Sequence, residues 1–346
     1  LHKAIRRQRQ MCIRDSSGVG VADALMQPAR TYLQIVGGFC ILNALIPICS
    51  SYLRAFGFSK EPLYASIIGN VINFCLNAFF LFVLHKGVAG VATATVISRI
   101  INLVIVVLLG AVLVKAKQHP ERESNRAVMG QIIRIGLPSA CETAIYNVSM
   151  TLVIRFLNQM DAQGLNVTAR SYTMQITNFS YCVGAALAQA NAIMTGWHIG
   201  AKEYDACDRG TKKAAVIGVI VAVILETVFT LCSGWIMQLF SKDPQMVSLV
   251  GKLLAIDIVL EIGRVTNLVY GQALKTSGDA VFPVVMGACF MILCSVGGTY
   301  LFGIRLGLLA VGAYIGMTGD ECVRAVGMYL RWKSGKWKEK GLVKSR

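Results

Sequence analysis

The sequence predicts an all-α polytopic membrane protein. Hydrophobic residues make up 55% of its 346 residues, charged residues only 15%, and the mean hydropathy is +0.59. Charged residues form roughly a quarter of a soluble globular domain. The apolar runs reach about 20 residues or more, the length that a helix needs to cross the hydrocarbon layer, and far longer than a transmembrane strand. The lipid bilayer is therefore the expected surrounding of most of the chain.

Nine candidate spans follow one another along the chain. They are 31–52, 62–84, 87–114, 132–157, 165–196, 212–240, 245–272, 281–304 and 307–330. Pro62 and Pro283 each open a span, where the missing N–H costs nothing because the first turn of a helix offers it no acceptor. We therefore expect nine transmembrane helices.

The polar segments between the spans divide the chain into regions. The run Gln10-Met11-Cys12-Ile13-Arg14-Asp15-Ser16 resembles a translated adapter of the kind used to prepare sequencing libraries, so residues 1–17 are expected to be a sequencing artefact. The remaining regions are 18–114 with three spans, the polar linker 115–131, 132–330 with six spans, and the basic tail 331–346.

Lys and Arg are distributed unevenly over alternate loops. The loops on one side, together with the tail, are rich in them, whereas the opposite loops contain Lys86, Lys242 and Arg305. Because cytoplasmic loops carry the excess of basic residues, we expect the linker and the C-terminus to be cytoplasmic.

A short repeat relates two loops that lie six spans apart. Leu53-Arg54-x-x-Gly57-x-x-x-x-Pro62 recurs as Leu274-Lys275-x-x-Gly278-x-x-x-x-Pro283, and Gly87 is echoed by Gly307. Copies six spans apart share one orientation, as in the parallel repeats of transporters.

A six-span unit used twice predicts a twelve-helix protein of two lobes (6+6). Residues 132–330 would supply a complete second lobe, and residues 18–114 the last three helices of the first. We therefore expect an N-terminally truncated chain that does not transport as it stands.

One apolar run carries charges at helical spacing. Asp257, Glu261 and Arg264 stand at i, i+4 and i+7, so a helix lines them along one face. Each charge at bilayer depth costs about 2.5 to 3.5 kcal/mol on insertion scales, and such residues mark ion or substrate pathways. The alternative is a structural Glu261–Arg264 pair that locks two helices together.

The fourth span places Glu142, Tyr146 and Ser149 on one face, which suggests a site for a hard cation or a proton. A capping or packing role for Glu142 is the alternative. Asp320 and Arg324 in the ninth span are expected to form a structural intrahelical pair.

Further polar side chains line single helical faces. They are Asn70, Asn73 and Asn77 in the second span, and Gln175 and Asn178 in the fifth, with Tyr172 and Phe179 nearby. Alone, each stripe is explained by interhelical hydrogen bonds of perhaps 0.6 kcal/mol. Several stripes beside buried charges favour a shared cavity. Glu226, alone in the sixth span, is expected either to snorkel to the interface or to pair with Arg99.

No enzyme chemistry is indicated. The four histidines lie in the head or in loops, without metal-ligand spacing, and the eleven cysteines are scattered singly. No phosphate-binding glycine loop and no nucleophile elbow is present. We expect no cofactor and no nucleic-acid partner.

A set of short motifs resembles one transporter family. They are Gly136-Leu137-Pro138-Ser139-Ala140-x-Glu142 with Tyr146-Asn147, Arg170-x-Tyr172, Gln189, Gly196, Leu260-Glu261-x-Gly263-Arg264-x-x-Asn267, Gly278-Asp279, Asp320-Glu321-x-x-Arg324 and Arg331-Trp332. Together they resemble the multidrug and toxic compound extrusion (MATE) family, on its bacterial DinF-like side.

The resemblance implies an antiporter in the bacterial inner membrane, acting as a monomer, that exports small organic compounds in exchange for Na⁺ or H⁺ by alternating access. It implies coupling acids at Glu142, Asp257 and Glu261, and a substrate cavity that includes Tyr146 and the polar stripes. The spacing of Glu142 from Pro138 departs from the sodium-binding pattern of the other branch. A lipid-linked saccharide flippase of the same superfamily is the alternative function; a membrane enzyme or a receptor scaffold is disfavoured by the repeat.

Overall fold

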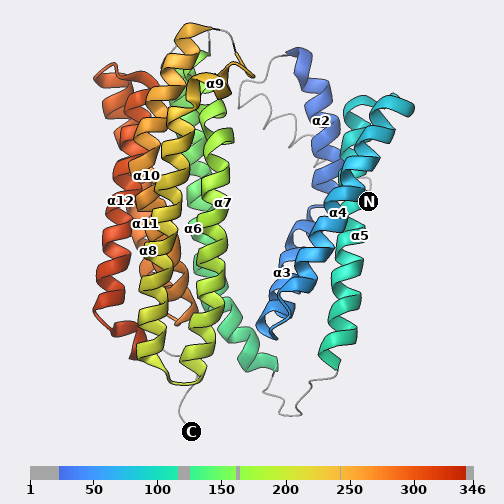
Figure 1. Cartoon of the computed structure of the whole chain (residues 1–346), viewed down its shortest axis with the longest axis vertical. Coiled ribbons are helices and arrows are strands. Elements are labelled where there is room, and N and C mark those ends of the chain that lie inside the picture. Colours follow the sequence, from blue (N-terminus) through green and yellow to red (C-terminus); the bar gives the residue numbers. More distant parts are fainter. Residues whose placement is uncertain (1–22, 116–124, 161–163, 242, 340–346) are drawn as a thin grey trace. The chain divides into compact units, whose positions relative to one another are not determined.

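The computed structural model describes residues 23–115, 125–160, 164–241 and 243–339 (Figure 1). Helices account for nearly all of these residues, and no strand occurs among them. The expected artefact at 1–17, part of the linker and the end of the tail lie outside the described residues.

The chain divides into two compact units, Leu1–Glu121 and Arg122–Arg346. The boundary between them falls inside the predicted linker 115–131. Each unit has its own internal packing.

The first unit is built around α5. Its elements are α2 (Asp23–Gly38), α3 (Ile41–Ala55), α4 (Lys60–Ala78), the π-helical η1 (Phe79–Val83) and α5 (Gly87–Lys115). Helix α5 packs against α2, α3 and α4. The predicted span 31–52 is not one helix, because α2 and α3 meet at a bend of 45°. The bend follows Gly37 and Gly38, whose missing side chains weaken a helix interior.

The second unit is built around α10. Its elements are α6 (Asn125–Met160), α7 (Leu165–Gly200), α8 (Tyr204–Leu231), α9 (Ser233–Met237), α10 (Pro244–Thr276), α11 (Val281–Phe290), the π-helical η2 (Met291–Val296) and η3 (Thr299–Arg305), α12 (Leu309–Lys333) and the 3₁₀ turn η4 (Lys336–Glu339). The predicted span 212–240 differs from the structure, where α8 begins at Tyr204 and ends at Leu231.

Small residues let helices approach α10 closely. Val265 of α10 lies between Gly184 of α7 and Gly218 of α8, and a Cβ at either glycine would stand 2.8 Å from a Val265 methyl. Gly263 faces the α12 backbone, and a Cβ there would meet Cys322 N at 2.9 Å. In membranes such contacts replace the hydrophobic effect between helices. Helix α10 is thus enclosed by α7, α8 and α12, which brings its charges into the interior of the unit.

Four helical stretches within the described residues are long and apolar enough to cross a membrane: Lys60–Val83, Gly87–Val114, Tyr204–Leu231 and Val281–Arg305. The bent pair α2 and α3 adds a fifth when its two helices are counted together as one broken span. The other long helices, α6, α7, α10 and α12, carry the polar and charged side chains described below. The predicted count of nine spans stays a prediction.

The repeated loops have the same backbone in both units. Gly57 and Gly278 have φ angles of 89° and 91°. In both loops the next amide donates to the carbonyl oxygen five positions back, at 3.0 Å in the first and 2.9 Å in the second. This bond and the positive φ define a helix C-terminal motif that favours glycine.

The second part of the repeat differs from its predicted register. Positive φ angles occur at His85 (48°) and Gly87 (53°), and again at Gly307 (69°) and Leu309 (52°). In chain order, His85 therefore corresponds to Gly307 and Gly87 to Leu309, whereas the sequence suggested that Gly87 corresponds to Gly307. The two loops repeat the positive φ angles, but glycine does not stand at the same position in both.

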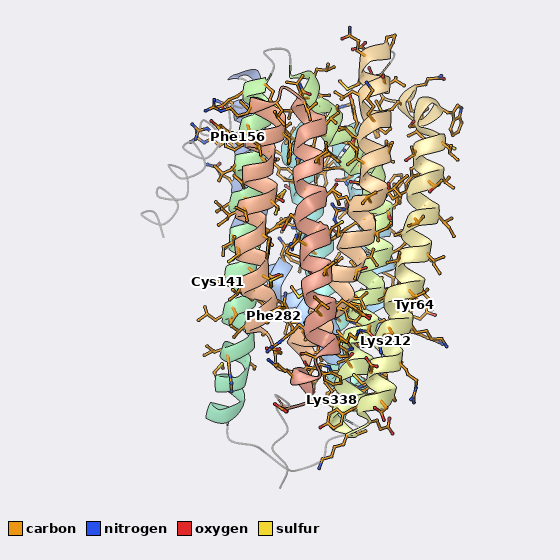
Figure 2. The ribbon with its side chains drawn as sticks, turned by 90° about the vertical axis from the view of Figure 1, so that its left-hand side faces the viewer. Tyr64, Cys141, Phe156, Lys212, Phe282 and Lys338 are labelled. Carbon is orange, nitrogen blue, oxygen red and sulfur yellow. The ribbon has the colours of Figure 1, made fainter. Side chains whose placement is uncertain are left out.

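Aromatic rings close one end of the second unit. Trp332 and Trp337 stack with ring centroids 4.2 Å apart, and Trp332 Nε1 donates to Asp208 Oδ1 at 2.9 Å. Figure 2 shows Lys212 and Lys338 at this same end, with Phe156 near the other. The contacts fix the start of the basic tail against α8.

Candidate functional site

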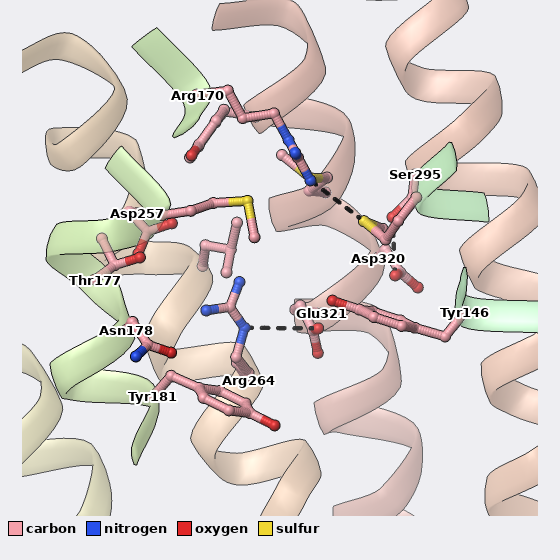
Figure 3. A pocket seen from close by; sticks show the side chains of 15 residues that line it. Tyr146, Arg170, Thr177, Asn178, Tyr181, Asp257, Arg264, Ser295, Asp320 and Glu321 are labelled. Atoms are coloured by element: carbon pink, nitrogen blue, oxygen red, sulfur yellow. Dashed lines mark hydrogen bonds and ion pairs between the residues drawn. The ribbon is translucent and has the colours of Figure 1, made fainter. Parts of the chain in front are cut away.

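A cavity of about 240 Å³ lies inside the second unit (Figure 3). Helices α6, α7, α10 and α12 and the turn η2 contribute its lining. The polar residues among them include Tyr146, Arg170, Asn178, Asp257, Arg264 and Glu321. Figure 3 shows Arg264 between Asn178 and Tyr181 on one side and Glu321 and Tyr146 on the other.

Arg264 links two acids. Its Nη1 lies 2.7 Å from Glu261 Oε2, and its Nε lies 3.9 Å from Glu321 Oε1. Asn267 Nδ2 also donates to Glu321 Oε2 at 3.0 Å. The guanidinium therefore has one close partner on α10 and one distant partner on α12.

The predicted Asp320–Arg324 pair is present, and each of its members has a further partner. Arg324 donates to both oxygens of Asp320, at 2.8 and 2.9 Å, and its Nη2 lies 2.9 Å from Glu321 Oε1. Ser295 Oγ donates to Asp320 Oδ2 at 2.9 Å. A two-point contact between guanidinium and carboxylate fixes geometry, so this group of residues joins η2 to α12.

Three buried acids keep oxygens without a hydrogen-bond partner. Asp257 is 2% exposed, and Glu226 and Glu261 are 0% exposed. Asp257 Oδ2, Glu261 Oε1 and both oxygens of Glu226 find no partner among the described residues. An unpartnered buried carboxylate oxygen is costly and points to a function or to an absent ligand. The burial of Glu226 shows that the snorkelling interpretation was wrong.

No group of three or more His, Cys, Asp and Glu side chains within the described part of the chain stands close enough to hold a metal ion. A cation at Asp257 or Glu261 would therefore need further oxygen ligands of another kind.

Glu142 takes part in a different contact from the one expected. Its Oε2 lies 2.6 Å from Nζ of Lys275, in the last turn of α10. Both residues line a second cavity of about 400 Å³, which shares Tyr146, Tyr181, Arg264 and Glu321 with the first cavity.

The predicted substrate residues are only partly brought together. Tyr146 and Asn178 line the first cavity. Tyr172 packs against Phe240 and Phe179 against Phe229, and neither lines the two cavities. Gln175 is exposed.

Asn70, Asn73 and Asn77 belong to the first unit. Asn77 donates to Asn73 at 3.0 Å, and Asn73 donates to Ser98 at 3.1 Å, while Asn70 is exposed. For these residues, as for Tyr172, Gln175 and Phe179, the substrate role stays a prediction.

Sequence reasoning missed Lys275 and Tyr181 as cavity residues. Lys275 belongs to the repeated loop, and no spacing in the sequence relates it to Glu142. Tyr181 does carry a signal, because it lies three residues after Asn178 and so shares its helical face.

Comparison with known proteins gives the family. The MatE family model matches residues 17–79 and 138–301. The uncharacterized transporter YisQ of *Bacillus subtilis* is 34% identical over 331 residues, which cover 94% of this chain and 72% of that protein. The probable multidrug resistance protein NorM of *Thermotoga maritima* is 21% identical over 326 residues, covering 91% and 68%.

Solved structures show the same fold. The eukaryotic MATE transporter AtDTX14 superposes with a TM-score of 0.86 at 18% identity, covering 97% of this chain and 78% of that one. A MATE crystal structure in the straight conformation gives 0.81 at 19% identity, covering 97% and 76%. With a family model that matches most of its length and a relative at 34% identity, the chain belongs to the MatE family of multidrug efflux transporters.

Proposed function

We propose that the chain acts in a secondary antiporter, which exports small organic compounds in exchange for a monovalent cation, Na⁺ or H⁺, by alternating access. The observation that carries the proposal is the buried pair Asp257 and Glu261, whose unpartnered oxygens lie on the helix that lines the first cavity. The balance of charge around that cavity also supports an exporter over a pyrophosphate-binding flippase, because three acids accompany two arginines.

Arg264 supplies a way for the cation to act on α12. A cation that binds Glu261 competes with the guanidinium for the same carboxylate, which Arg264 now holds at 2.7 Å. The released guanidinium has Glu321, 3.9 Å away, as its nearest alternative partner. Cation binding would thus move the Arg264 guanidinium from Glu261 on its own helix to Glu321 on α12, which changes the contact between these helices.

Glu142 is a weaker candidate for the coupling acid than the sequence indicated. A Na⁺ ion on Glu142 would lie beside the ammonium group of Lys275, which contacts the same carboxylate at 2.6 Å. Two positive charges so close together repel each other strongly inside a protein. We therefore place the ion on Asp257 and Glu261.

Cation binding is tested first, on the purified chain. A ligand that binds only the folded state raises its stability by about 2.7 kcal/mol at a hundredfold excess over its Kd. We expect Na⁺, compared with K⁺ at equal ionic strength, to raise the melting temperature; if H⁺ is the ion, lower pH raises it instead. Asp257→Asn and Glu261→Gln should both abolish the response.

The matched control is Asp208→Asn, which removes a carboxylate that lines neither cavity and pairs with Lys212 at 2.7 Å. This variant should keep the cation response. A response that survives in both Asp257→Asn and Glu261→Gln would remove these residues from the proposal.

Export is tested in the full-length *Bacillus subtilis* relative. Proteoliposomes with an imposed Na⁺ or H⁺ gradient should extrude ethidium, and replacing the residue aligned with Glu261 by Gln should stop extrusion without preventing membrane insertion. Unchanged extrusion in that variant would contradict cation coupling at this position.

We also propose the bacterial inner membrane as the location, with a monomeric protein and a cytoplasmic C-terminus. The clustering of Lys212 and Lys338 at one end of the second unit supports this orientation (Figure 2). In intact cells, a cysteine at Lys338→Cys should resist an impermeant thiol reagent and react after permeabilisation; labelling before permeabilisation would reverse the assignment.

A further inference from the structure

The second cavity is lined by a charged pair that differs from the other ion pairs of the unit. Glu142 on α6 and Lys275 on α10 lie 2.6 Å apart, with side chains 18% and 19% exposed. Glu142 Oε2 nevertheless makes no hydrogen bond of acceptable geometry among the described residues. The contact is therefore an ion pair without a directional bond.

Neither member of this pair has a second ion-pair partner in the described part of the chain. Arg264 and Arg324, which line the same cavity, each contact two acids. Among the ion pairs that line this cavity, the Glu142–Lys275 pair can therefore be separated by a ligand with the fewest other ion pairs broken.

The space around the pair suits a molecule with an apolar body. Leu268, Pro283, Met291 and Met328 line the cavity together with the rings of Tyr146 and Tyr181. Gly287 on α11 lets the acid approach this helix closely, because a Cβ there would stand 3.4 Å from Glu142 Oε1. The volume of about 400 Å³ falls in the range of small-molecule sites.

The opposite charges of Glu142 and Lys275 determine which charges a ligand at this site should carry. A simple organic cation on Glu142 would leave the Lys275 ammonium without its partner, and a simple anion on Lys275 would leave Glu142 bare. Removing one member of a partly buried ion pair is unfavourable because the other charge stays desolvated. A zwitterion replaces both partners at once.

We propose that Glu142 and Lys275 form a binding subsite for zwitterionic compounds, with the ammonium group of the ligand on Glu142, its carboxylate on Lys275 and its apolar body against the methionines and tyrosines. The inference rests on the proposed function as a small-molecule exporter and names zwitterions as one class of its substrates. In the absence of ligand, Glu142 and Lys275 neutralise each other, and the ligand replaces each of them as the partner of the other.

The test uses three probes with one indole body: tryptophan as the zwitterion, tryptamine as the cation and indole-3-propionate as the anion. Equilibrium dialysis of radiolabelled tryptophan against the purified full chain, with the other two as competitors, measures their relative affinities. We expect tryptophan to bind at least about tenfold more tightly than either competitor, a difference of about 1.4 kcal/mol.

Single substitutions should reverse the preference in opposite directions. Glu142→Gln leaves Lys275 unpaired, so indole-3-propionate should become the tightest probe. Lys275→Gln leaves Glu142 unpaired, so tryptamine should become the tightest. A purely structural role of the pair would weaken all three probes together, which separates that explanation from the proposal.

Arg331→Gln is the matched control. This variant breaks the ion pair between Arg331 and Asp279, which has the same length of 2.6 Å. Neither residue lines either cavity, so the order of affinities for the three probes should be unchanged. Equal binding of the three probes, no measurable binding of tryptophan, or the same order in both cavity variants would each overturn the inference.

The outcome is distinct from that of the proposed antiport. Loss of the zwitterion preference, with export still driven by cations, removes only this subsite. Loss of cation coupling with the preference intact removes the antiport mechanism and leaves the subsite in place.

Discussion

Replacing Gly312 by Ala should destabilise the second unit although alanine favours helices. Gly312 lies in the first turns of α12, against η3. A Cβ at this position would stand 2.5 Å from Gly303 N and 2.6 Å from Phe302 O, and it would also meet the carbonyl carbon of Phe302. These are backbone atoms, which cannot rotate away, so α12 and η3 must separate.

The size of the effect follows from two opposing terms. Overpacking a well-packed interior costs about 1 to 3 kcal/mol, and occasionally more. Alanine in place of glycine in a helix gains roughly 0.5 to 1 kcal/mol. The net loss in the free energy of unfolding lies between about 0 and 2.5 kcal/mol. We expect Gly312→Ala to fall at the upper end of this range, because the atoms that it meets belong to the backbone.

The same helix supplies the control. A Cβ at Gly319 would meet no atom within 4 Å, so Gly319→Ala should keep the helix gain and melt at or above the wild-type temperature. The first unit supplies a replicate at Gly90, where a Cβ would stand 2.8 Å from Phe80 Cβ. A Cβ atom is fixed by its own backbone and cannot rotate away, so Gly90→Ala should also destabilise, but less than Gly312→Ala because the new methyl group is less crowded.

Thermal unfolding in detergent, followed with a dye that fluoresces on reaction with newly exposed thiols, gives the measurement. Cys207 in the second unit is only 1% exposed and reports the unfolding of α8. Equal melting temperatures for Gly312→Ala and Gly319→Ala would refute the reasoning, since the two variants differ only in what the new methyl group meets.

Two further changes test the buried polar contacts by the same melting assay. Asp320→Asn leaves the Arg324 guanidinium, whose side chain is 5% exposed, with only Glu321 as an acidic partner. Because Glu321 still compensates the buried charge, a loss of about 1 to 3 kcal/mol is expected, and unchanged stability would show that the pair contributes nothing. Trp332→Phe keeps an aromatic ring but removes the 2.9 Å hydrogen bond to Asp208, so a loss of about 1 to 3 kcal/mol is expected, and a variant as stable as wild type would assign the contribution to ring packing alone.

The helical architecture of the membrane segments could be predicted from the sequence because hydrocarbon leaves few alternatives. Apolar length indicated the stretches Lys60–Val83, Gly87–Val114 and Val281–Arg305, and the i, i+4, i+7 spacing placed Asp257, Glu261 and Arg264 on one face. Burial of Asp257 and Glu261 followed from the cost of exposing charge to lipid.

The contacts between distant segments could not be predicted in this way. Glu142 and Lys275 meet because α6 and α10 both border the second cavity, and no local pattern in either helix contains that information. The register of the second part of the repeat also does not follow from its glycines, because the same positive φ angle is adopted by Gly87 in one copy and by Leu309 in the other.

The charged pairs within single helices bear on how the protein enters the membrane. Glu261 and Arg264 are three residues apart on α10, and Asp320 and Arg324 are four apart on α12. Each helix can therefore neutralise an acid with its own arginine before any neighbour is present. A segment leaving the translocon would carry much of its charge already matched, so insertion of these two helices need not wait for the rest of the unit to be synthesised.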